Sequence, residues 1–349
     1  MTEMTSLPAE YYTDSQIFEQ EIEQVFRSSW QYVGDTSRLS KAGDFLMRHI
    51  NETSVLAVRD DNGMLRAFYN VCAHRGSQIE DETAGNRSRF QCPYHAWTYS
   101  LTGELTKTPN FPGKKPVFEK NECGLTSLPV STFGPLAFVS LETTEAAVRE
   151  LLAPITETFD QYAVDEFEYV CSDTHSIDCN WKVYIDNYLE CDHCQFNHPS
   201  FTAAVDMDTY DIECYNALVV QSAPLSAEGI RDKTPSVVSR SAADRYFSVW
   251  MWPNVTIDIA PWTMEIGYVN PVSPNRTVVY SEFFNRSGEQ TPEWSRSYEY
   301  SKQIMAEDVA LCERHQKGLS SGGFQTGPLS PTEQGLRHFQ RKIRSQLET

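Results

Sequence analysis

The sequence predicts an α+β fold in which a small all-β domain is followed by a larger domain with an antiparallel sheet and a long C-terminal helix. Its 349 residues have room for two domains with separate hydrophobic cores. Residues 40–145 show short strand-like segments separated by turns, whereas strand and helix patterns mix after residue 165. Thr291, followed by proline and glutamate, is typical of a helix start and predicts the C-terminal helix.

The N-terminal segment is predicted to be helical. Residues 8–30 contain Ser15 as a candidate N-cap, and apolar side chains follow it at helical spacing. These apolar residues are Ile17, Phe18, Ile22, Val25 and Phe26. We expect residues 1–39 to form a helical segment that packs on the C-terminal domain.

Residues 40–145 are predicted to form the all-β domain. Strand-like residues 55–58 and 65–69 flank Asp-Asp-Asn-Gly at residues 60–63, a sequence that favours a hairpin turn. A second turn is expected at residues 101–104, between two further strands. This pattern predicts a small domain made of short strands.

Residues 146–349 are predicted to form the larger domain. Residues 146–163 have a helical pattern and connect the two domains. Successive antiparallel strands are expected at residues 247–253, 255–260, 264–269 and 277–284. The C-terminal helix is expected to begin after Thr291, run to about Lys317 and stop at Gly318, because glycine commonly ends helices.

The composition, with 40% hydrophobic and 22% charged residues, is typical of a soluble globular protein. No apolar run approaches the ~18 residues needed to span a membrane. The first six residues lack the basic stretch and apolar core of a secretory signal, so we expect a cytoplasmic protein.

The net charge of −19 argues against nucleic acid or anionic membranes as partners, because phosphate binding needs clustered Lys and Arg. The acidity favours solubility; alternatively, its negative field attracts a cationic substrate.

Two short segments each combine one cysteine with one histidine. Cys72 and His74 are followed, after seventeen intervening residues, by Cys92 and His95. Such a set fits either a tetrahedral structural zinc or a Rieske 2Fe–2S cluster, in which two cysteines hold one iron and two histidines the other. Zinc fingers usually pair cysteine with cysteine, whereas each loop of a Rieske site must reach both irons. The mixed pairs therefore favour the Rieske cluster, with these four residues as its ligands.

A second pair of histidines follows a predicted helix over residues 180–193, which has one apolar face. His193 stands at the end of this helix, and His198 directly precedes Pro199, which disfavours helix at the residue before it. On a straight helix, side chains five residues apart would point ~140° apart. Two histidines that bind one metal therefore require the helix to break between them.

Asp308 is the candidate third ligand. It lies in the middle of the apolar stripe of the C-terminal helix, where an ionised carboxylate is costly unless it is paired or binds a metal. A salt bridge would explain it, but two histidines and one carboxylate also form the pattern of non-haem Fe(II) oxygenases. Glu190, one turn before His193, is expected near the iron, either orienting a histidine or bridging to a cluster histidine.

These motifs resemble those of the catalytic alpha subunits of Rieske non-haem iron oxygenases over nearly the whole chain. The matching segments are Cys72-Ala73-His74-Arg75-Gly76, Cys92-Pro93-Tyr94-His95-Ala96-Trp97, Asn180-Trp181-Lys182, Glu190-x-x-His193-x-x-x-x-His198-Pro199 and Glu307-Asp308. The resemblance implies a Rieske domain at residues 40–145 and a helix-grip catalytic domain at residues 146–349. It implies that His193, His198 and Asp308 bind iron. It further implies that Glu190 is the bridging acid and that the subunits form a homotrimer, in which one subunit's cluster reduces the neighbour's iron.

The identity of residue 190 indicates the branch that the chain resembles. Many ring-hydroxylating members have aspartate at the bridging position, whereas Glu190 is similar to the carnitine, choline and betaine monooxygenase branch. Residues 187–191 and 316–318 resemble the same branch, while Asp192 replaces an aromatic residue that the branch often carries. The resemblance implies a monooxygenase that uses O2 to oxidise an N-methylated or quaternary ammonium compound, releasing an aldehyde.

Candidate substrate contacts are aromatic residues near the iron segment or on sheet strands. They are Tyr184, Phe201, Trp250 and Trp262, together with Trp252. Aromatic faces attract quaternary ammonium groups by cation–π interaction, worth ~0.5–2 kcal/mol each. Because such residues line ordinary cores just as often, both interpretations stay open.

The sequence also bears on partners. It has no G-x-G-x-x-G after a strand and hence no recognisable nicotinamide or flavin domain. Electrons are therefore expected from a separate NAD(P)H-dependent flavin/iron–sulfur reductase. The Cys191-x-x-Cys194 pair flanks His193 outside a thioredoxin-like context, so we expect neither a redox nor a zinc role for it.

Three other functions would account for some or all of these motifs. An aromatic-ring-hydroxylating dioxygenase would share every motif above. A Rieske electron carrier would lack the mononuclear iron, and Asp308 on its apolar stripe argues against it. A zinc-stabilised binding module would be colourless, and the mixed cysteine–histidine loops argue against it.

Overall fold

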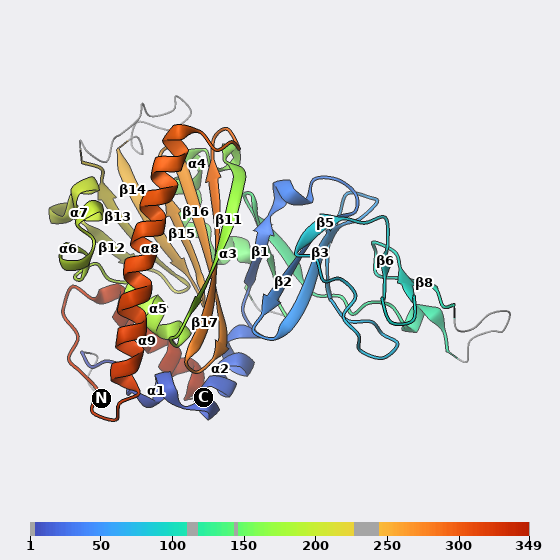
Figure 1. The fold of residues 1–349 in the computed structure, drawn as a ribbon, viewed down its shortest axis with the longest axis horizontal. Coiled ribbons are helices and arrows are strands. Elements are labelled where there is room, and N and C mark those ends of the chain that lie inside the picture. The colour runs from blue at the N-terminus through green and yellow to red at the C-terminus, as the bar shows by residue number, and fades with distance from the viewer. Residues whose placement is uncertain (1–3, 110–117, 143–145, 227–243, 349) are drawn as a thin grey trace. The chain divides into compact units, whose positions relative to one another are not determined.

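The computed structural model describes residues 4–109, 118–142, 146–226 and 244–348. Contacts divide the chain into two compact units, one of residues Arg27–Val148 and one of Met1–Phe26 with Arg149–Thr349. Within the described residues, the first unit is built from small β-sheets and the second from a seven-stranded antiparallel sheet with helices (Figure 1). The predicted α+β class, with a β domain preceding a larger mixed domain, is confirmed.

The predicted boundaries at residues 39/40 and 145/146 differ from those of the compact units. Residues 27–39 pack with the β unit, because β1 pairs antiparallel with β10 of that unit. The division of the chain into functional segments 1–39, 40–145 and 146–349 stays a prediction.

The β unit contains three sheets among its described residues. Their strands, in the order in which they pair, are β1 (Gln31–Asp35), β10 (Leu136–Val139) and β9 (Val130–Phe133); β4 (Leu65–Tyr69), β3 (Thr53–Arg59), β2 (Asp44–Ile50) and β5 (Ala84–Asn86); and β6 (Phe90–Gln91), β7 (Thr98–Tyr99) and β8 (Leu105–Lys107). Two short 3-10 helices, η2 (Thr36–Leu39) and η3 (Lys120–Glu122), lie between them. β4 and β6 belong to different sheets, so the loops that follow them can approach one point from two sides.

The hairpin predicted at residues 60–63 joins β3 to β4. Its turn is held by the buried carboxylate of Asp60, which accepts hydrogen bonds from the amides of Asn62 (2.9 Å) and Met64 (2.8 Å). Gly63 has a φ of 75°, a left-handed conformation that glycine adopts without steric cost. Arg66 adds an ion pair of 3.0 Å to the same carboxylate.

The N-terminal helix of the larger unit is shorter and more broken than predicted. It consists of α1 (Glu10–Thr13), α2 (Ser15–Glu21) and a π-helical turn, η1 (Ile22–Phe26). Asp14 rather than Ser15 is the N-cap of α2, because its carboxylate accepts from the amides of Gln16 and Ile17.

The predicted connector helix over residues 146–163 is also divided, into α3 (Val148–Leu151), η4 (Ala153–Ile155) and α4 (Thr156–Tyr162). Pro154 explains the break, since proline has no amide hydrogen for a helix interior. A further 3-10 turn, η5 (Val164–Glu166), leads into the sheet.

The sheet of the larger unit is antiparallel throughout. Its strands, in the order in which they pair, are β11 (Glu168–Ile177), β17 (Arg276–Asn285), β16 (Thr263–Ser273), β15 (Val255–Ile259), β14 (Arg245–Met251), β13 (Leu218–Pro224) and β12 (Asp211–Cys214). Between β11 and β12 the chain forms α5 (Trp181–Tyr188), α6 (Cys194–Asn197), α7 (Pro199–Ala204) and η6 (Met207–Thr209). The segment between β11 and β12 therefore supplies both predicted iron histidines.

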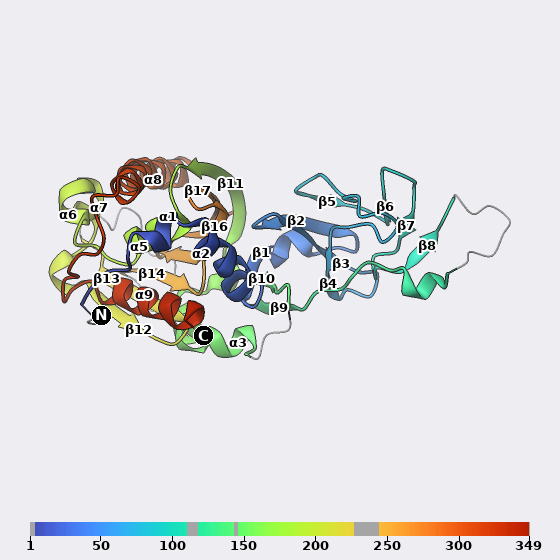
Figure 2. The ribbon, with the colours of Figure 1, turned by 90° about the horizontal axis from the view of Figure 1, so that it is seen from below.

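Two longer helices complete this unit, α8 (Pro292–Leu319) and α9 (Gln334–Leu347). The hydroxyl of Thr291 caps α8 by accepting from the Trp294 amide at 3.2 Å, as its sequence predicts. The helix continues through Gly318 to Leu319, contrary to the predicted stop, because the Leu319 side chain is buried in the core. α8 runs across the sheet in Figure 1, and α5 contacts both α8 and β16 (Figure 2).

The N-terminal helices are anchored to the larger unit by a buried ion pair. Lys182 Nζ lies 2.5 Å from Glu21 Oε1, and neither side chain is exposed. The second oxygen of Glu21 accepts a hydrogen bond from Trp181 Nε1 at 2.8 Å. The Trp181 ring itself is held by Phe26 and Phe339, whose rings meet it edge-on.

None of the described helices combines the length and the apolar character that crossing a membrane would need.

Candidate cluster and iron sites

The two cysteine–histidine loops of the β unit have the same backbone conformation. In each loop, the cysteine amide donates to the carbonyl five residues later (2.8 Å), and the amide four residues later donates back to the cysteine carbonyl (3.0 Å). The residues that donate back, Gly76 and Ala96, both have positive φ, of 73° and 55°. Two matching loops can therefore present one cysteine and one histidine each from opposite sides of a shared centre.

The side chains of these loops have the donor set of a Rieske cluster. Cys72 and Cys92 are buried free thiols, and the rings of His74 and His95 lie 4.7 Å apart between centroids. The Nδ1 atoms of both histidines are buried and have no hydrogen-bond partner among the described residues. A buried nitrogen without a partner is costly, and an iron bound at each Nδ1 would remove that cost.

The hydroxyl of Tyr99 lies 3.1 Å from Cys72 Sγ and also accepts the Ala73 amide hydrogen bond at 3.1 Å. Because its oxygen accepts from Ala73, its own hydrogen is free to point toward the sulfur. We expect Tyr99→Phe to lower the reduction potential of the cluster by about 60–130 mV, the one-electron equivalent of a ~1.5–3 kcal/mol charge-assisted hydrogen bond. A redox titration followed by the visible spectrum measures this shift.

Tyr69→Phe is the matched control for that titration, because the Tyr69 hydroxyl donates to the Leu141 carbonyl and not to a cysteine. Its potential should equal that of the unchanged protein. A Tyr99→Phe potential that also stays unchanged would show that the hydroxyl does not act on the sulfur.

In the larger unit, the structure brings His193, His198 and Asp308 together. One ligand atom of each lies within 4.8 Å of the others, and these are the only three residues in the described part of the chain that form such a group. Asp308 Oδ1 lies 3.0 Å from His198 Nε2 and 3.7 Å from His193 Nε2. The helix break occurs earlier than predicted, at the end of α5, so that both histidines follow it.

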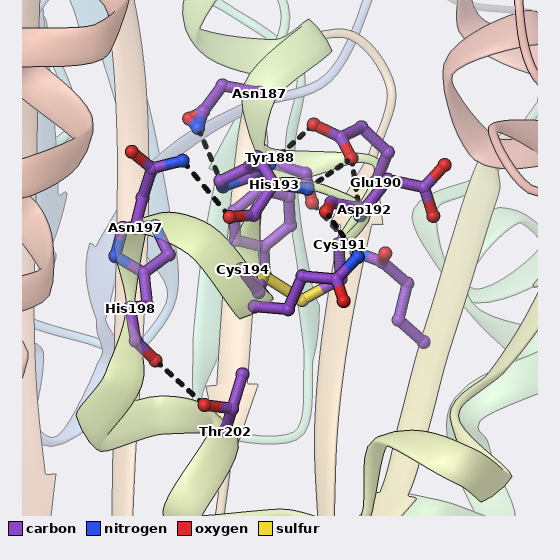
Figure 3. Close-up of a disulfide and its surroundings, with 12 residues drawn as sticks. Asn187, Tyr188, Glu190, Cys191, Asp192, His193, Cys194, Asn197, His198 and Thr202 are labelled. Carbon is purple, nitrogen blue, oxygen red and sulfur yellow. Dashed lines mark hydrogen bonds and ion pairs between the residues drawn. A yellow bond between two sulfur atoms is a disulfide. The ribbon is translucent and has the colours of Figure 1, made fainter.

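The turn between α5 and α6 is organised by Glu190. Its Oε2 accepts from the amides of Asp192 (2.6 Å) and His193 (3.3 Å), and its Oε1 lies 2.5 Å from His193 Nδ1 (Figure 3). This arrangement places the Nδ1 proton of His193 on the Glu190 side and directs Nε2 toward Asp308.

Two further residues support the site in ways that the sequence did not predict. Glu307 Oε2 lies 2.7 Å from His198 Nδ1 and so acts on His198 as Glu190 does on His193. Asn187 donates from Nδ2 to Asp308 Oδ1 at 2.9 Å. In the sequence, Glu307 stands next to Asp308 and Asn187 stands one turn before Glu190. These positions were the available signals for a role at the site, but residue type alone assigned neither residue one.

The electrostatics of the group fit a cation. Burial alone lowers the pKa of His193, but hydrogen bonds to Asp308 and Glu190 outweigh it and raise the pKa to about 9. Burial raises the pKa of Asp308, but hydrogen bonds from His193 and His198 outweigh it and lower the pKa. The acids thus hold positive charge between them, which a divalent metal bound by two neutral imidazoles and a carboxylate would supply instead.

A disulfide joins Cys191 to Cys194, a pair for which the sequence predicted neither a redox nor a zinc role. Figure 3 shows it beside the turn that carries Glu190 and His193. Seven other cysteines are free thiols. The bond closes a short loop around His193 and thereby restricts the backbone that positions this histidine.

A cavity of about 260 Å³ opens beside His193, His198 and Asp308. Of the predicted substrate residues, Tyr184, Phe201 and Trp262 line it. Further lining residues not predicted from the sequence are Tyr188, Tyr210, Tyr246, Asp258, Glu265 and Tyr298. The cavity wall is therefore rich in aromatic residues and contains, besides Asp308 and Glu190, two further carboxyl groups.

Trp250 does not line the cavity and is a correction to the predicted set. It lies on the same face of β14 as Tyr246 and Ser248, but nearer to the end of the strand. There its ring packs edge-on against Phe339 of α9, and Nε1 donates to the Pro253 carbonyl at 3.0 Å. Trp252, also near Phe339, belongs to the same core.

Comparison with known proteins gives two family matches. The family "Ring hydroxylating alpha subunit (catalytic domain)" matches residues 164–349, and the "Rieske [2Fe-2S] domain" matches residues 29–129. The chain is 31% identical to the chloroplastic choline monooxygenase of Arabidopsis thaliana, over 95% of this chain and 80% of the relative. It is 29% identical to the carnitine monooxygenase oxygenase subunit of Acinetobacter pittii (strain PHEA-2), over 97% of this chain and 94% of the relative.

Similar solved structures include the quaternary ammonium Rieske monooxygenase CntA in complex with L-carnitine. Its TM-score is 0.87 at 26% identity, with 98% of this chain and 95% of that chain covered. Naphthalene 1,2-dioxygenase from Rhodococcus sp. has a TM-score of 0.80 at 20% identity, with 98% and 94% covered, and shows a shared fold.

Proposed function

The chain belongs to the ring-hydroxylating alpha-subunit family and carries a Rieske [2Fe-2S] domain. We therefore propose that its substrate is an N-methylated or quaternary ammonium compound of the choline, carnitine or betaine type. The protein is an oxidoreductase, the terminal oxygenase of a multicomponent monooxygenase, with a 2Fe–2S cluster and a mononuclear iron. The observation that carries the substrate proposal is the aromatic cavity beside His193, His198 and Asp308. Aromatic faces bind quaternary ammonium groups that carry no hydrogen-bond donor.

We assign the cofactors to the residues whose arrangement fits them. Cys72, His74, Cys92 and His95 would hold the cluster, and His193, His198 and Asp308 would hold the iron. Bound there, the cluster supplies single electrons and the iron supplies O2 activation.

The chain's own residues prepare the iron site for this chemistry. Glu190 and Glu307 hold the Nδ1 protons of His193 and His198, so that both Nε2 atoms face a common point. Tyr184 and Trp262, in the cavity wall, would hold the substrate beside that point. Glu190 would also connect His193 to a cluster histidine of a neighbouring subunit.

The oxygenase works with a separate reductase, as the oxygenase subunit of a multicomponent system does. We propose that this reductase is an NAD(P)H-dependent flavin/iron–sulfur protein and that the oxygenase is a homotrimer. The similar CntA is described as using inter-subunit electron transfer, which supports an oligomer. We also propose a cytoplasmic location, where NAD(P)H is available to the reductase; cell fractionation would test it.

Two alternatives predict different products. An aromatic-ring dioxygenase would add oxygen to an arene, and the likeness to naphthalene 1,2-dioxygenase shares the fold alone. A Rieske electron carrier would consume no O2 with any substrate, and the grouping of His193, His198 and Asp308 argues against it.

The test is O2 uptake by the reconstituted oxygenase with a reductase and NADH. Choline, L-carnitine and glycine betaine would be compared with naphthalene and benzoate, and aldehyde would be measured. We expect uptake and aldehyde with at least one quaternary ammonium compound. Hydroxylated arene without aldehyde would overturn the substrate proposal in favour of the dioxygenase.

A further inference from the structure

Two carboxyl groups in the cavity wall face each other across neighbouring strands. Asp258 on β15 and Glu265 on β16 are register partners, and both line the cavity. Residues directly opposite in an antiparallel pair have Cβ atoms about 4.5–5.5 Å apart, and like charges in such positions destabilise the sheet. A cation between them would turn this repulsion into attraction.

The groups that contact these carboxyls within the protein are neutral. Asp258 Oδ1 accepts from the hydroxyls of Tyr188 (3.1 Å) and Tyr246 (2.5 Å), and Glu265 Oε2 accepts from Ser301 at 2.5 Å. Among the residues that the structure describes, neither carboxyl has an ion-pair partner. Burial raises the pKa of Asp258 to about 6 and, together with the charge of Asp258, that of Glu265 to about 7.

Glu21, a buried acid in the core of the same unit, differs from these two carboxyls because it has a counter-charge. Where Glu21 is buried in the core of the same unit, Lys182 neutralises it at 2.5 Å. The described residues that line the cavity include no lysine and no arginine. Next to Asp258 and Glu265 a ligand must therefore supply the positive charge, and a carboxylate on that ligand would find no lysine or arginine in the cavity wall to pair with.

We propose that Asp258 and Glu265 form an anionic subsite that binds the ammonium group of the substrate and that the enzyme selects cations without a carboxylate, of the choline type, over carnitine and betaines. This inference rests on the proposed function and narrows it. The aromatic walls supply cation–π attraction, which cannot distinguish choline from carnitine because both carry the same trimethylammonium group. The two carboxyls make that distinction, because they attract net positive charge and repel a zwitterion's carboxylate.

The test is calorimetric binding to the anaerobic holoenzyme without reductase, with three probes. These are choline, L-carnitine and 3,3-dimethylbutan-1-ol, the neutral compound in which carbon replaces the nitrogen of choline. We expect choline to bind at least about tenfold more tightly than either of the others. Carnitine binding as tightly as choline, or the neutral isostere doing so, would overturn the inference.

Charge-neutral variants locate the effect. Asp258→Asn and Glu265→Gln should each weaken choline binding by about tenfold or more and leave binding of the neutral isostere within about threefold. Glu213→Gln, an exposed acid on β12 of the same sheet, is the matched control and should bind choline normally. Choline affinity that stays unchanged in both folded cavity variants would overturn the inference.

A pH series decides the question even if a variant does not fold. The titratable groups that face the pair or act on it through their charge are Tyr184 and Tyr188 on α5, Tyr210 after η6, Tyr246 on β14, Asp173 on β11 and Asp308 on α8. Below the pKa values of about 6 and 7, the carboxyls must lose protons before they bind a cation. Choline affinity should then fall by up to about tenfold per pH unit for each proton displaced, while isostere affinity stays constant. Parallel curves for choline and the isostere would overturn the inference.

The two proposals fail in different ways. If carnitine is oxidised and binds better than choline, the proposed function stands and this inference falls. If no quaternary ammonium compound is oxidised, the proposed function fails, whichever probe binds.

Discussion

Replacing Asp308 with alanine is expected to remove the mononuclear iron and to lower oxygenase activity by on the order of 10³-fold or more. His193 and His198 would then be the only protein ligands of this group, and two neutral imidazoles without an anion bind a ferrous ion weakly. Iron analysis should fall from about three to about two atoms per chain. The visible spectrum of the 2Fe–2S cluster should stay unchanged, because its candidate ligands lie in the other compact unit.

Glu190→Gln is the informative comparison for this variant. The side-chain oxygen of the introduced glutamine can still accept hydrogen bonds from the backbone amides of Asp192 and His193, so the turn and the iron content should persist. If Glu190 carries electrons to the iron, the reduced cluster should be reoxidised far more slowly in the presence of substrate and O2. An Asp308→Ala protein that kept the third iron and its activity would show that Asp308 is not a ligand.

Replacing Lys182 with methionine is expected to lower the free energy of unfolding by about 3–5 kcal/mol. The substitution would leave Glu21 fully buried beside Trp181 without a counter-charge, and an uncompensated buried charge has this cost. Urea unfolding followed by circular dichroism measures the loss. The effect reaches the iron site indirectly, because Lys182 lies in the first turn of α5, whose end leads to Glu190 and His193.

Two comparisons separate the buried charge from the lost contacts. Lys302→Met removes an exposed lysine that pairs with Glu299 on α8 and should change stability by at most about 1 kcal/mol. Adding Glu21→Leu to Lys182→Met removes the unpaired carboxylate and should recover a large part of the loss. If the single Lys182→Met variant were as stable as Lys302→Met, the ion pair would have no role in anchoring the N-terminal helices.

Local pattern was sufficient for features that depend on neighbours in sequence. The hairpin at residues 60–63 formed as predicted because Asp60 and Gly63 satisfy that turn by themselves. Thr291 capped α8 for the same reason, since its hydroxyl needs only an amide three residues away. The mixed spacing of cysteine and histidine likewise indicated a cluster before any fold was known. Family comparison confirms the Rieske domain.

Features that depend on competition between local signals were predicted less well. Ser15 and Asp14 are both good caps, and only the backbone conformation decided for Asp14. Gly318 is a common helix terminator, but burial of Leu319 continued the helix past it. Helical spacing suggested that α5 reaches His193, whereas Glu190 ended it earlier by binding the amides that follow.

Residue types and short spacings were enough to indicate the cofactor class, the candidate ligands and the family branch, because their chemistry is contained in those features. The packing of Trp250 against Phe339, while Trp262 lines the cavity, follows from the three-dimensional fold alone, although both are aromatic residues close in sequence. The fold alone also paired Asp258 with Glu265, since strand register fixes which residues stand opposite each other. Substrate selectivity depends on such placements because charges and rings act through space, over distances that the order of residues does not contain.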